Sequence, residues 1–223
     1  MRFLVVFLLL NITFFRAEPQ NQARKVIPKV VIGIVVENMR SDYIDRFGNR
    51  FGNNGFNKLY AEGTSFTSFR MNQFIQHSAP GTATLYTGVT PSTHGIIGKN
   101  WYDRAKEAER NCCADDSFSI VGAITRTGGV SPGQLRASTV AEQLKLFTNG
   151  KARIYSVAMN CAPALFSCGF AGDAAYWFDP VSGNMVTTSF YTNQLPEWAV
   201  KFNRQNLARD YAKRNWALFK SPS

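Results

Sequence analysis

The chain has 223 residues, of which 45% are hydrophobic, so it is long enough for one domain with a substantial core. It carries 25 basic and 15 acidic side chains, a net charge of +10. This excess favours anionic ligands through the overall field of the protein, but the Lys and Arg residues are scattered. No run of them indicates a nucleic-acid groove.

The first residues have the pattern of a signal peptide. Arg2 precedes an apolar run from Phe3 to Leu10, and small Ala17 follows at the end of the segment. The run is shorter than the stretch of about 20 apolar residues that usually spans a membrane. We therefore expect a signal peptide at residues 1–17, a linker at 18–27, a domain at 28–223 and a periplasmic or secreted protein. Phe15 is a poor cleavage residue, so an uncleaved N-terminal anchor is the alternative.

The first predicted strand is Lys29–Val36, a nearly continuous β-branched run. A strand that is apolar on both faces suits the centre of a parallel sheet covered by helices. Glu37 follows at its carboxyl end, where open α/β sheets place their ligand sites. The next predicted elements are helices at Ser41–Phe47 and Phe56–Ala61 and a strand at Ser65–Arg70.

Ser78 begins a stretch in which a hydroxyl residue is followed by Pro80 and small residues. This order predicts a helix that starts at Ser78 with Pro in its first turn. The amide groups and dipole at a helix start attract anions such as phosphate, and a hydroxyl beside an anion site is a candidate nucleophile. The alternative is that Ser78 only caps the helix.

The second half of the chain alternates strand and helix patterns, which indicates α/β architecture. An amphipathic helix at Thr139–Phe147 is followed by Asn149-Gly150, and Arg153–Met159 is predicted to be a second buried strand that delivers Asn160 to the edge of the sheet. The remaining expected segments are a short helix through Leu165, the aromatic segment AYWFD, Asn184–Ser189, and helices at Glu197–Asn203 and Leu207–Trp216.

The four cysteines are Cys112, Cys113, Cys161 and Cys168. An adjacent disulfide would be strained, so a disulfide would link Cys112 or Cys113 to a distant partner, or Cys161 to Cys168. The sequence leaves these alternatives open. The spacing lacks the C-x-x-C pattern of a zinc knuckle.

The run SAPGTATLYTGVTPSTHGIIGKNWYDR at residues 78–104 resembles the alkaline phosphatase superfamily. The nearest likeness is to the phosphate-insensitive bacterial alkaline phosphatases and the nucleotide pyrophosphatase/phosphodiesterases. It extends from Val31 to about Trp216 and includes VVENMRSDY, GGV-SP and GDAAYWFD. The resemblance implies an α/β, alkaline-phosphatase-like sandwich with a central mostly parallel sheet covered by helices. The C-terminal part of that fold would be missing from this sequence.

The resemblance also implies chemistry. Members of the family use two zinc ions and a hydroxyl nucleophile held on one of them. Glu37 falls where the family has an Asp metal ligand, and Ser78 falls where these relatives have a Thr nucleophile that also contacts metal. Lys99, with Asn100 beside it, falls where the family has an Asn that donates to a phosphoryl oxygen. We therefore expect Lys99 and Asn100 to bind substrate.

Other positions depart from the family. Asn160 and Ala162 replace a Lys and an Arg that bind the phosphate in the bacterial monoesterases. We expect Asn160 to retain a substrate contact. Thr82 and Phe170 stand where relatives commonly have His. Of the two histidines in the chain, His94 is expected to orient its loop through hydrogen bonds, and His77 matches no ligand position.

These observations predict a secreted, metal-dependent phosphoric ester hydrolase acting on a phosphate ester or a nucleotide-like small molecule. We expect catalysis to be impaired, because the remaining metal ligands of the family lie beyond the position of Trp216. The alternatives are a noncatalytic anion- or nucleotide-binding relative and a nonfunctional gene fragment.

Overall fold

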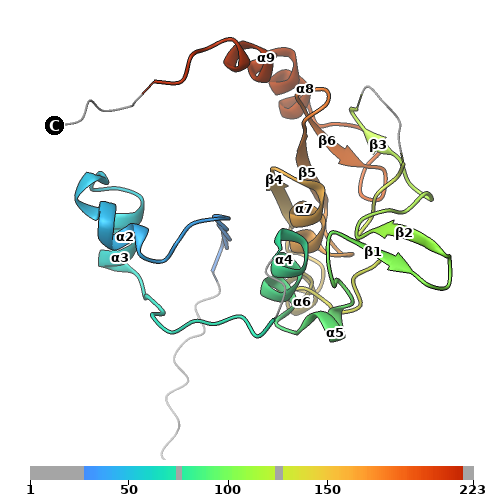
Figure 1. The fold of residues 1–223 in the computed structure, drawn as a ribbon, viewed down its shortest axis with the longest axis horizontal. Helices are drawn as coiled ribbons and strands as arrows, with labels where there is room; N and C mark the ends of the chain where they lie inside the picture. Colours follow the sequence, from blue (N-terminus) through green and yellow to red (C-terminus); the bar gives the residue numbers. More distant parts are fainter. Residues whose placement is uncertain (1–27, 74–76, 124–127, 218–223) are drawn as a thin grey trace, which may run out of the picture. The chain divides into compact units, whose positions relative to one another are not determined.

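The computed structural model describes residues 28–73, 77–123 and 128–217. The chain forms two compact units, Met1–Phe56 and Asn57–Ser223, shown in Figure 1. The expected signal peptide and linker lie outside the described residues, and the domain boundaries proposed from the sequence stay predictions.

The first unit contains short helices. α2 spans Tyr43–Phe47, and the 3-10 turn η1 spans Gly48–Arg50. α3 (Phe56–Glu62) begins with the last residue of the first unit and continues in the second. The ring centroids of Phe51 and Phe56 lie 5.4 Å apart, so aromatic packing closes the turn between η1 and α3. Both helices predicted in this region are confirmed, although α2 begins two residues later than expected.

The two strands predicted before Ser78 are wrong. Lys29–Val36 and Ser65–Arg70 have no strand structure, and Ile32 and Ile34 are each 77% exposed. A β-branched run becomes a strand only where another strand satisfies its backbone groups. In the described part of the chain, no strand pairs with either run.

The second unit is built on a four-stranded mixed sheet in the order β3-β6-β5-β4. β4 (Tyr155–Ala158) pairs in parallel with β5 (Ala174–Asp179), and β6 (Asn184–Thr188) pairs antiparallel with both β5 and β3 (Ile120–Val121). The α/β class is therefore confirmed. The parallel arrangement expected for the sheet is found between β4 and β5.

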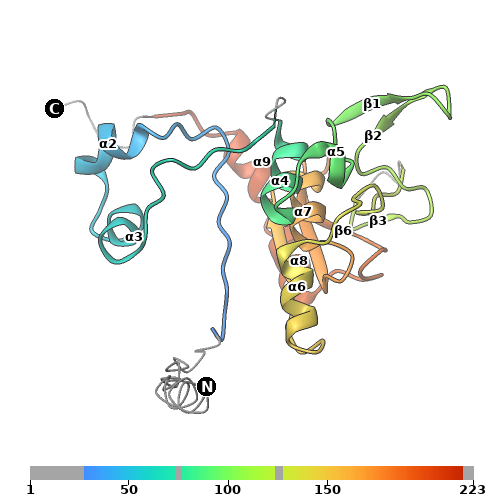
Figure 2. The ribbon, with the colours of Figure 1, turned by 90° about the horizontal axis from the view of Figure 1, so that it is seen from below.

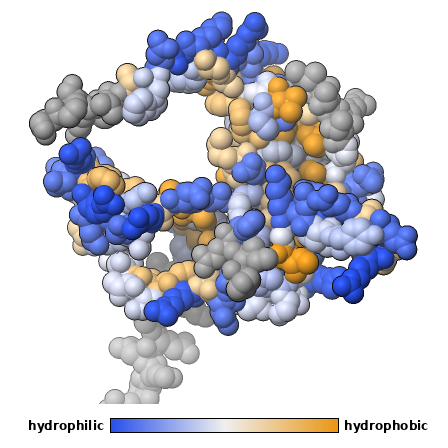
Figure 3. Space-filling view, viewed as in Figure 1, coloured by the Kyte–Doolittle hydropathy of each residue, from blue (hydrophilic) through white to orange (hydrophobic). Residues whose placement is uncertain are grey.

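β4 was expected to be buried, and this expectation is wrong. β4 is the edge strand of the described sheet, and Tyr155 and Val157 on it are 64% and 65% exposed. Side chains alternate between the two faces of a strand, so the intervening Ser156 and Ala158 face the other way and are half-buried. Hydrophobic residues reach the molecular surface among hydrophilic ones in Figure 3.

Helices cover both faces of the sheet, as Figures 1 and 2 show. α7 (Cys161–Cys168) packs on β4 and β5, and its other side contacts α4 (Ser78–Thr87) and α6 (Val140–Phe147). On the opposite face, Tyr176 of β5 meets Trp198 of α8 (Glu197–Arg204), with ring centroids 5.0 Å apart.

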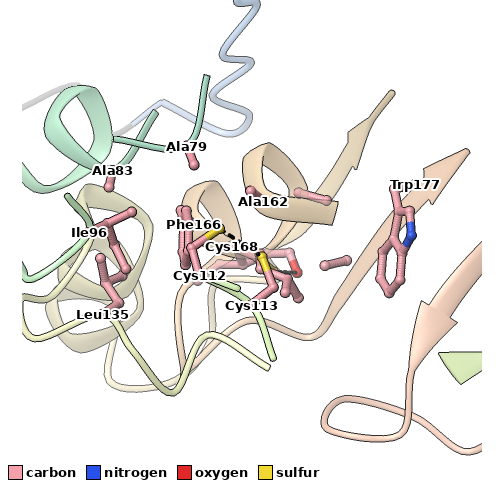
Figure 4. Close-up of a cluster of buried hydrophobic side chains, with 14 of the residues drawn as sticks. Ala79, Ala83, Ile96, Cys112, Cys113, Leu135, Ala162, Phe166, Cys168 and Trp177 are labelled. Atoms are coloured by element: carbon pink, nitrogen blue, oxygen red, sulfur yellow. Dashed lines mark hydrogen bonds between the residues drawn. The ribbon is translucent and has the colours of Figure 1, made fainter. Parts of the chain in front are cut away.

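The alternation along β5 explains this division into layers. Ala175 and Trp177 belong to the main core with α7, whereas Ala174 and Tyr176 form a smaller core with Leu195. The main core includes Phe166, which is fully buried, and is drawn in Figure 4. A strand buried on both faces needs helices on both sides, which gives three layers.

Several small elements have no counterpart in the sequence-based expectations. They are α5 (Pro91–His94) and the hairpin formed by β1 (Asn100–Asp103) and β2 (Ala108–Asn111). The last expected helix is present as α9 (Leu207–Ala212), which ends earlier than predicted. Among the described residues, no helix is long and apolar enough to cross a membrane.

Glu142 joins α6 to the turn after α7. Its Oε2 accepts a hydrogen bond of 2.6 Å from the amide of Thr139, and Oε1 accepts bonds from the amides of Phe170 (3.0 Å) and Ala171 (3.3 Å). The hydroxyl of Thr139 accepts from the amide of Glu142 in return, which completes a capping box. Gly169 has φ of 69°, and a Cβ at this position would clash with the Glu142 carboxylate, so the position requires glycine.

We expect Glu142→Ala to destabilise the protein by about 3 kcal/mol, because three amide groups lose a charged acceptor. The neighbouring Gln143→Ala change, on an exposed side chain, should cost less than about 0.5 kcal/mol. Urea unfolding followed by circular dichroism measures both changes. Equal stability of the two variants would contradict a structural role for the Glu142 carboxylate.

Candidate active site

Ser78 is the first residue of α4, and its side chain is exposed. The carbonyl of His77 accepts the first helical hydrogen bond, 2.8 Å from the amide of Gly81, so His77 occupies the cap position. The expectation that a helix starts at Ser78 is confirmed. The alternative that Ser78 caps this helix is wrong, because Ser78 already lies within its first turn.

The first turn of α4 presents few amide donors. Pro80 has no N–H group, and the amide of Gly81 is bonded within the turn. The amides of Ser78 and Ala79 are therefore the first-turn groups for which the helix itself has no acceptor. They lie beside the Ser78 hydroxyl and add positive potential at this end of the helix.

α4 and α7 approach each other through small side chains. Ala79 and Ala83 on α4 belong to the same buried cluster as Ala162 on α7, as Figure 4 shows. Alanine allows two helices to pack closely. The two helices that begin at Ser78 and just after Asn160 are thus held together by packing.

Asn160 and Ala162 differ in accessibility. Asn160 is exposed at the cap position of α7 and makes no side-chain capping bond within the described residues, whereas Ala162 is 9% exposed. A polar side chain at Asn160 can reach solvent and a ligand. Ala162 instead fills the helix interface, and a long cation there would need the interface to open.

Lys99 and Asn100 lie at the start of the β1–β2 hairpin, and both are exposed. The carbonyl of Lys99 accepts from the amide of Cys112 at 2.8 Å, and Asn100 Oδ1 accepts from Asn111 Nδ2 at 2.8 Å. The Asn100 oxygen therefore serves the hairpin. The Lys99 ammonium is the group of this pair that is suited to an anion.

His94 is fully buried and links three segments. Its Nδ1 accepts from the amide of Ile96 at 3.1 Å, so the proton of the neutral ring is on Nε2, which lies 3.0 Å from Thr84 Oγ1. The Thr84 hydroxyl in turn donates to Gln73 Oε1 at 2.7 Å. This chain of bonds connects the HGIIG loop, α4 and the segment before Ser78. The orienting role expected for His94 agrees with these contacts.

Thr84 and Gln73 were not singled out from the sequence. Thr84 lies six residues after Ser78 in α4, and nothing in the sequence distinguishes it from other helical threonines. Gln73 carries no motif at all. Only the hydrogen bonds of Thr84, to His94 and to Gln73, reveal that both residues hold the chain around Ser78.

Two further motifs of the resemblance have structural roles. In the GGV-SP segment, the Ser131 hydroxyl donates to Asp115 Oδ2 at 2.5 Å, and this bond lowers the pKa of Asp115. In GDAAYWFD, Asp173 accepts from Lys145 at 3.0 Å and from Arg153 at 2.9 Å. These bonds tie together loops and strands of the second unit.

The expected metal ligands, Glu37 and Ser78, belong to different units, so their arrangement around a metal stays a prediction. Glu37 belongs to the first unit, where it is exposed beside Asn38, which has φ of 58°. In the part of the chain that the structure describes, no group of three or more His, Cys, Asp or Glu side chains is placed to hold a metal ion. Both nitrogens of His94 are already used in hydrogen bonds. The described donors therefore do not fit two zinc ions, each of which needs about four ligands.

Burial lowers the pKa of His94 from its ordinary value of 6.5. The unfolded chain therefore binds a proton more readily than the folded chain, and the stability present above pH 6.5 falls as pH drops through the lowered pKa. We expect His94→Asn to remove the part of the pH dependence of unfolding free energy that lies between about pH 7 and pH 5. His77→Asn, which removes the other histidine at an exposed position, is the matched control. Urea unfolding across this range checks the result, and a slope that survives in His94→Asn would contradict it.

Comparisons with known proteins agree with this architecture. Alkaline phosphatase PhoV of Synechococcus elongatus is 36% identical over 198 residues, which are 89% of this chain and 36% of PhoV. A calcium-transporting ATPase of Myroides odoratus is 35% identical over 85% of this chain and 34% of its own length. Alkaline phosphatase PafA of Elizabethkingia meningoseptica is 32% identical over 85% and 35% of the two chains. This chain thus spans about a third of the length of the curated relatives it matches.

The crystal structure of wild-type PafA superposes with a TM-score of 0.82 at 31% identity, covering 86% of this chain and 37% of PafA. This match confirms the alkaline-phosphatase-like α/β fold. The family described as type I phosphodiesterase / nucleotide pyrophosphatase matches residues 31–220. Because that match covers most of the sequence, this chain belongs to the type I phosphodiesterase / nucleotide pyrophosphatase family of the alkaline phosphatase superfamily.

Proposed function

We propose that this chain belongs to a secreted phosphoric ester hydrolase in which the Ser78 hydroxyl receives the phosphoryl group. The observation that carries this proposal is the exposed Ser78 on the first turn of α4, within the region that matches the family. Its substrate would be a phosphate ester or a nucleotide-like small molecule. Zinc would be the metal of such a hydrolase, although the described residues do not fit a zinc pair.

The proposed reaction has two stages. In the first stage the bond from Ser78 Oγ to phosphorus forms as the ester P–O bond breaks, the hydroxyl proton passes to solvent, and the leaving oxygen takes a proton from solvent to become the alcohol. In the second stage water attacks phosphorus, the bond to Ser78 Oγ breaks, and the serine oxygen regains a proton. In this proposal the positive end of α4 faces the transferred group, and the exposed Lys99 supplies a cation from the start of the hairpin. Such contacts stabilise negative charge that develops on the phosphoryl oxygens.

We propose further that turnover by this chain alone is weak. The described side chains provide no metal-binding group, and the family's cationic pair is replaced by Asn160 and buried Ala162. Each lost charge-assisted contact costs about 1.5–3 kcal/mol. The same observations favour, as the second candidate, a noncatalytic relative that binds anions or nucleotides.

We expect Ser78→Ala to abolish turnover of 4-nitrophenyl phosphate esters. The fold should survive, because Ser78 lies after the cap and an exposed substitution there costs less than about 1 kcal/mol. Ser78→Thr retains the hydroxyl and should retain or raise the rate. Ser92→Ala, which removes another exposed hydroxyl at a helix start, is the matched control.

Release of nitrophenol and circular dichroism give both readouts for these variants. A folded Ser78→Ala protein with parental activity would refute the nucleophile assignment. Binding of inorganic phosphate without turnover in the parent would favour the noncatalytic candidate.

Diester hydrolysis should exceed monoester hydrolysis, because the dianionic monoester needs more positive charge than Asn160 and Ala162 supply. Asn160→Lys should raise the ratio of monoester to diester turnover by about tenfold, the equivalent of about 1.4 kcal/mol. Asn193→Lys adds the same charge at another exposed asparagine and should leave the ratio unchanged. Rates with 4-nitrophenyl phosphate and its methyl diester decide the matter. A strong monoester preference in the parent would contradict this prediction.

A further inference from the structure

Three of the four cysteines, two after the end of β2 and one at the start of α7, lie in or against the main buried cluster. Cys112 and Cys113 follow β2 directly, and their sulfur atoms lie 3.6 Å apart. Cys161 is the first residue of α7, and it packs against the buried cluster that contains both of them. Cys161 lies beside Cys113 and contributes to raising the pKa of Cys113, after the larger effect of Cys112. Figure 4 shows the Cys112 and Cys113 sulfurs beside α7.

All four thiols are free in this structure, and their positions discriminate between pairings. Cys168 lies two turns along α7 from Cys161, about 10 Å away, which is beyond the span of a disulfide. Its thiol instead contacts the carbonyl of Ala174 at 3.4 Å. Adjacent residues such as Cys112 and Cys113 have Cα atoms about 3.8 Å apart, which is shorter than disulfides prefer. Cys113 and Cys161 are distant in sequence and close in space.

We propose that Cys113 and Cys161 form a disulfide by exchange with a low-molecular-weight disulfide, so that the base of the hairpin becomes bonded to the first turn of α7. The two residues differ in access, which sets the order of events. Cys161 is half-buried, whereas Cys113 is 1% exposed.

The exchange has two steps. The Cys161 thiolate attacks one sulfur of the small disulfide, whose sulfur–sulfur bond breaks and releases one small thiolate. The Cys113 thiolate then attacks Cys161 Sγ in the mixed disulfide and releases the second. The two protein thiols lose two electrons and two protons, and the small disulfide becomes two thiols. Because the pKa of Cys113 is raised, the second step should be faster in alkaline solution.

The bond would restrain the site region. It closes the chain between residue 113 and residue 161, and it fixes the turn that carries Asn160 and Ala162 against the hairpin that begins with Lys99. A bond across so long a loop restricts the unfolded chain strongly, so the oxidised protein should melt at a temperature higher by on the order of 5 °C or more.

The test uses the full chain incubated with oxidised glutathione at about pH 8.5, near the ordinary thiol pKa. We expect titratable thiols to fall from four to two. Blocking with iodoacetamide and digestion with trypsin should then give peptide 111–126 joined to peptide 154–201, with fragment masses that locate the bond at Cys113 and Cys161. Dithiothreitol should restore four thiols and the lower melting temperature.

Variants make the assignment specific. Cys161→Ser and Cys113→Ser should each prevent the cross-link and the rise in melting temperature, whereas Cys112→Ser and Cys168→Ala should retain both. A link between Cys112 and Cys113, a link that includes Cys168, a bond only between two chains, or a reaction that stops at glutathione bound to Cys161 would each overturn the proposal. An unchanged count of four thiols would overturn it as well.

Discussion

The packing of α7 between the sheet and α4 is the constraint on which the second unit depends. One side of α7 lies on β4 and β5, and the other side contacts α4 and α6. Leu165 and Phe166 are fully buried between these layers. Small residues set the separation, since Ala83 and Ala162 leave room for the two helices to approach. The start of α4, with Ser78, is therefore fixed by contacts made along the rest of that helix.

Glu142 extends this arrangement to the loop after α7. The Glu142 carboxylate accepts hydrogen bonds from three backbone amides. These bonds replace its contacts with water, so its burial is tolerated. The residue that follows Gly169 is Phe170. Its ring contacts Phe190 with centroids 6.2 Å apart, so this residue contributes to packing.

The sequence predicted the elements whose signals are local. Thr139–Phe147 has a capping box and an amphipathic pattern, and the helix forms as expected. Lys29–Val36 has the composition of a strand, but strand formation depends on partners that composition does not specify. The hairpin at Asn100–Asn111 was missed because its strands have only four residues each and β2 lacks large apolar side chains. Within the site, Ser78 was recognisable from Pro80 and the motif, whereas the bonds of Thr84 to Gln73 and to His94 depend on tertiary contacts that carry no local pattern.

The exposed face of β4 also bears on how the protein behaves in solution. As an edge strand it presents backbone donors and acceptors beside Val157, the kind of edge that recruits strands from other molecules. The net charge of +10 opposes such encounters through mutual repulsion. Salt screens that repulsion while leaving hydrophobic attraction in place, so self-association through β4 would strengthen as ionic strength rises. The net charge and the exposed edge of β4 thus act on self-association in opposite directions.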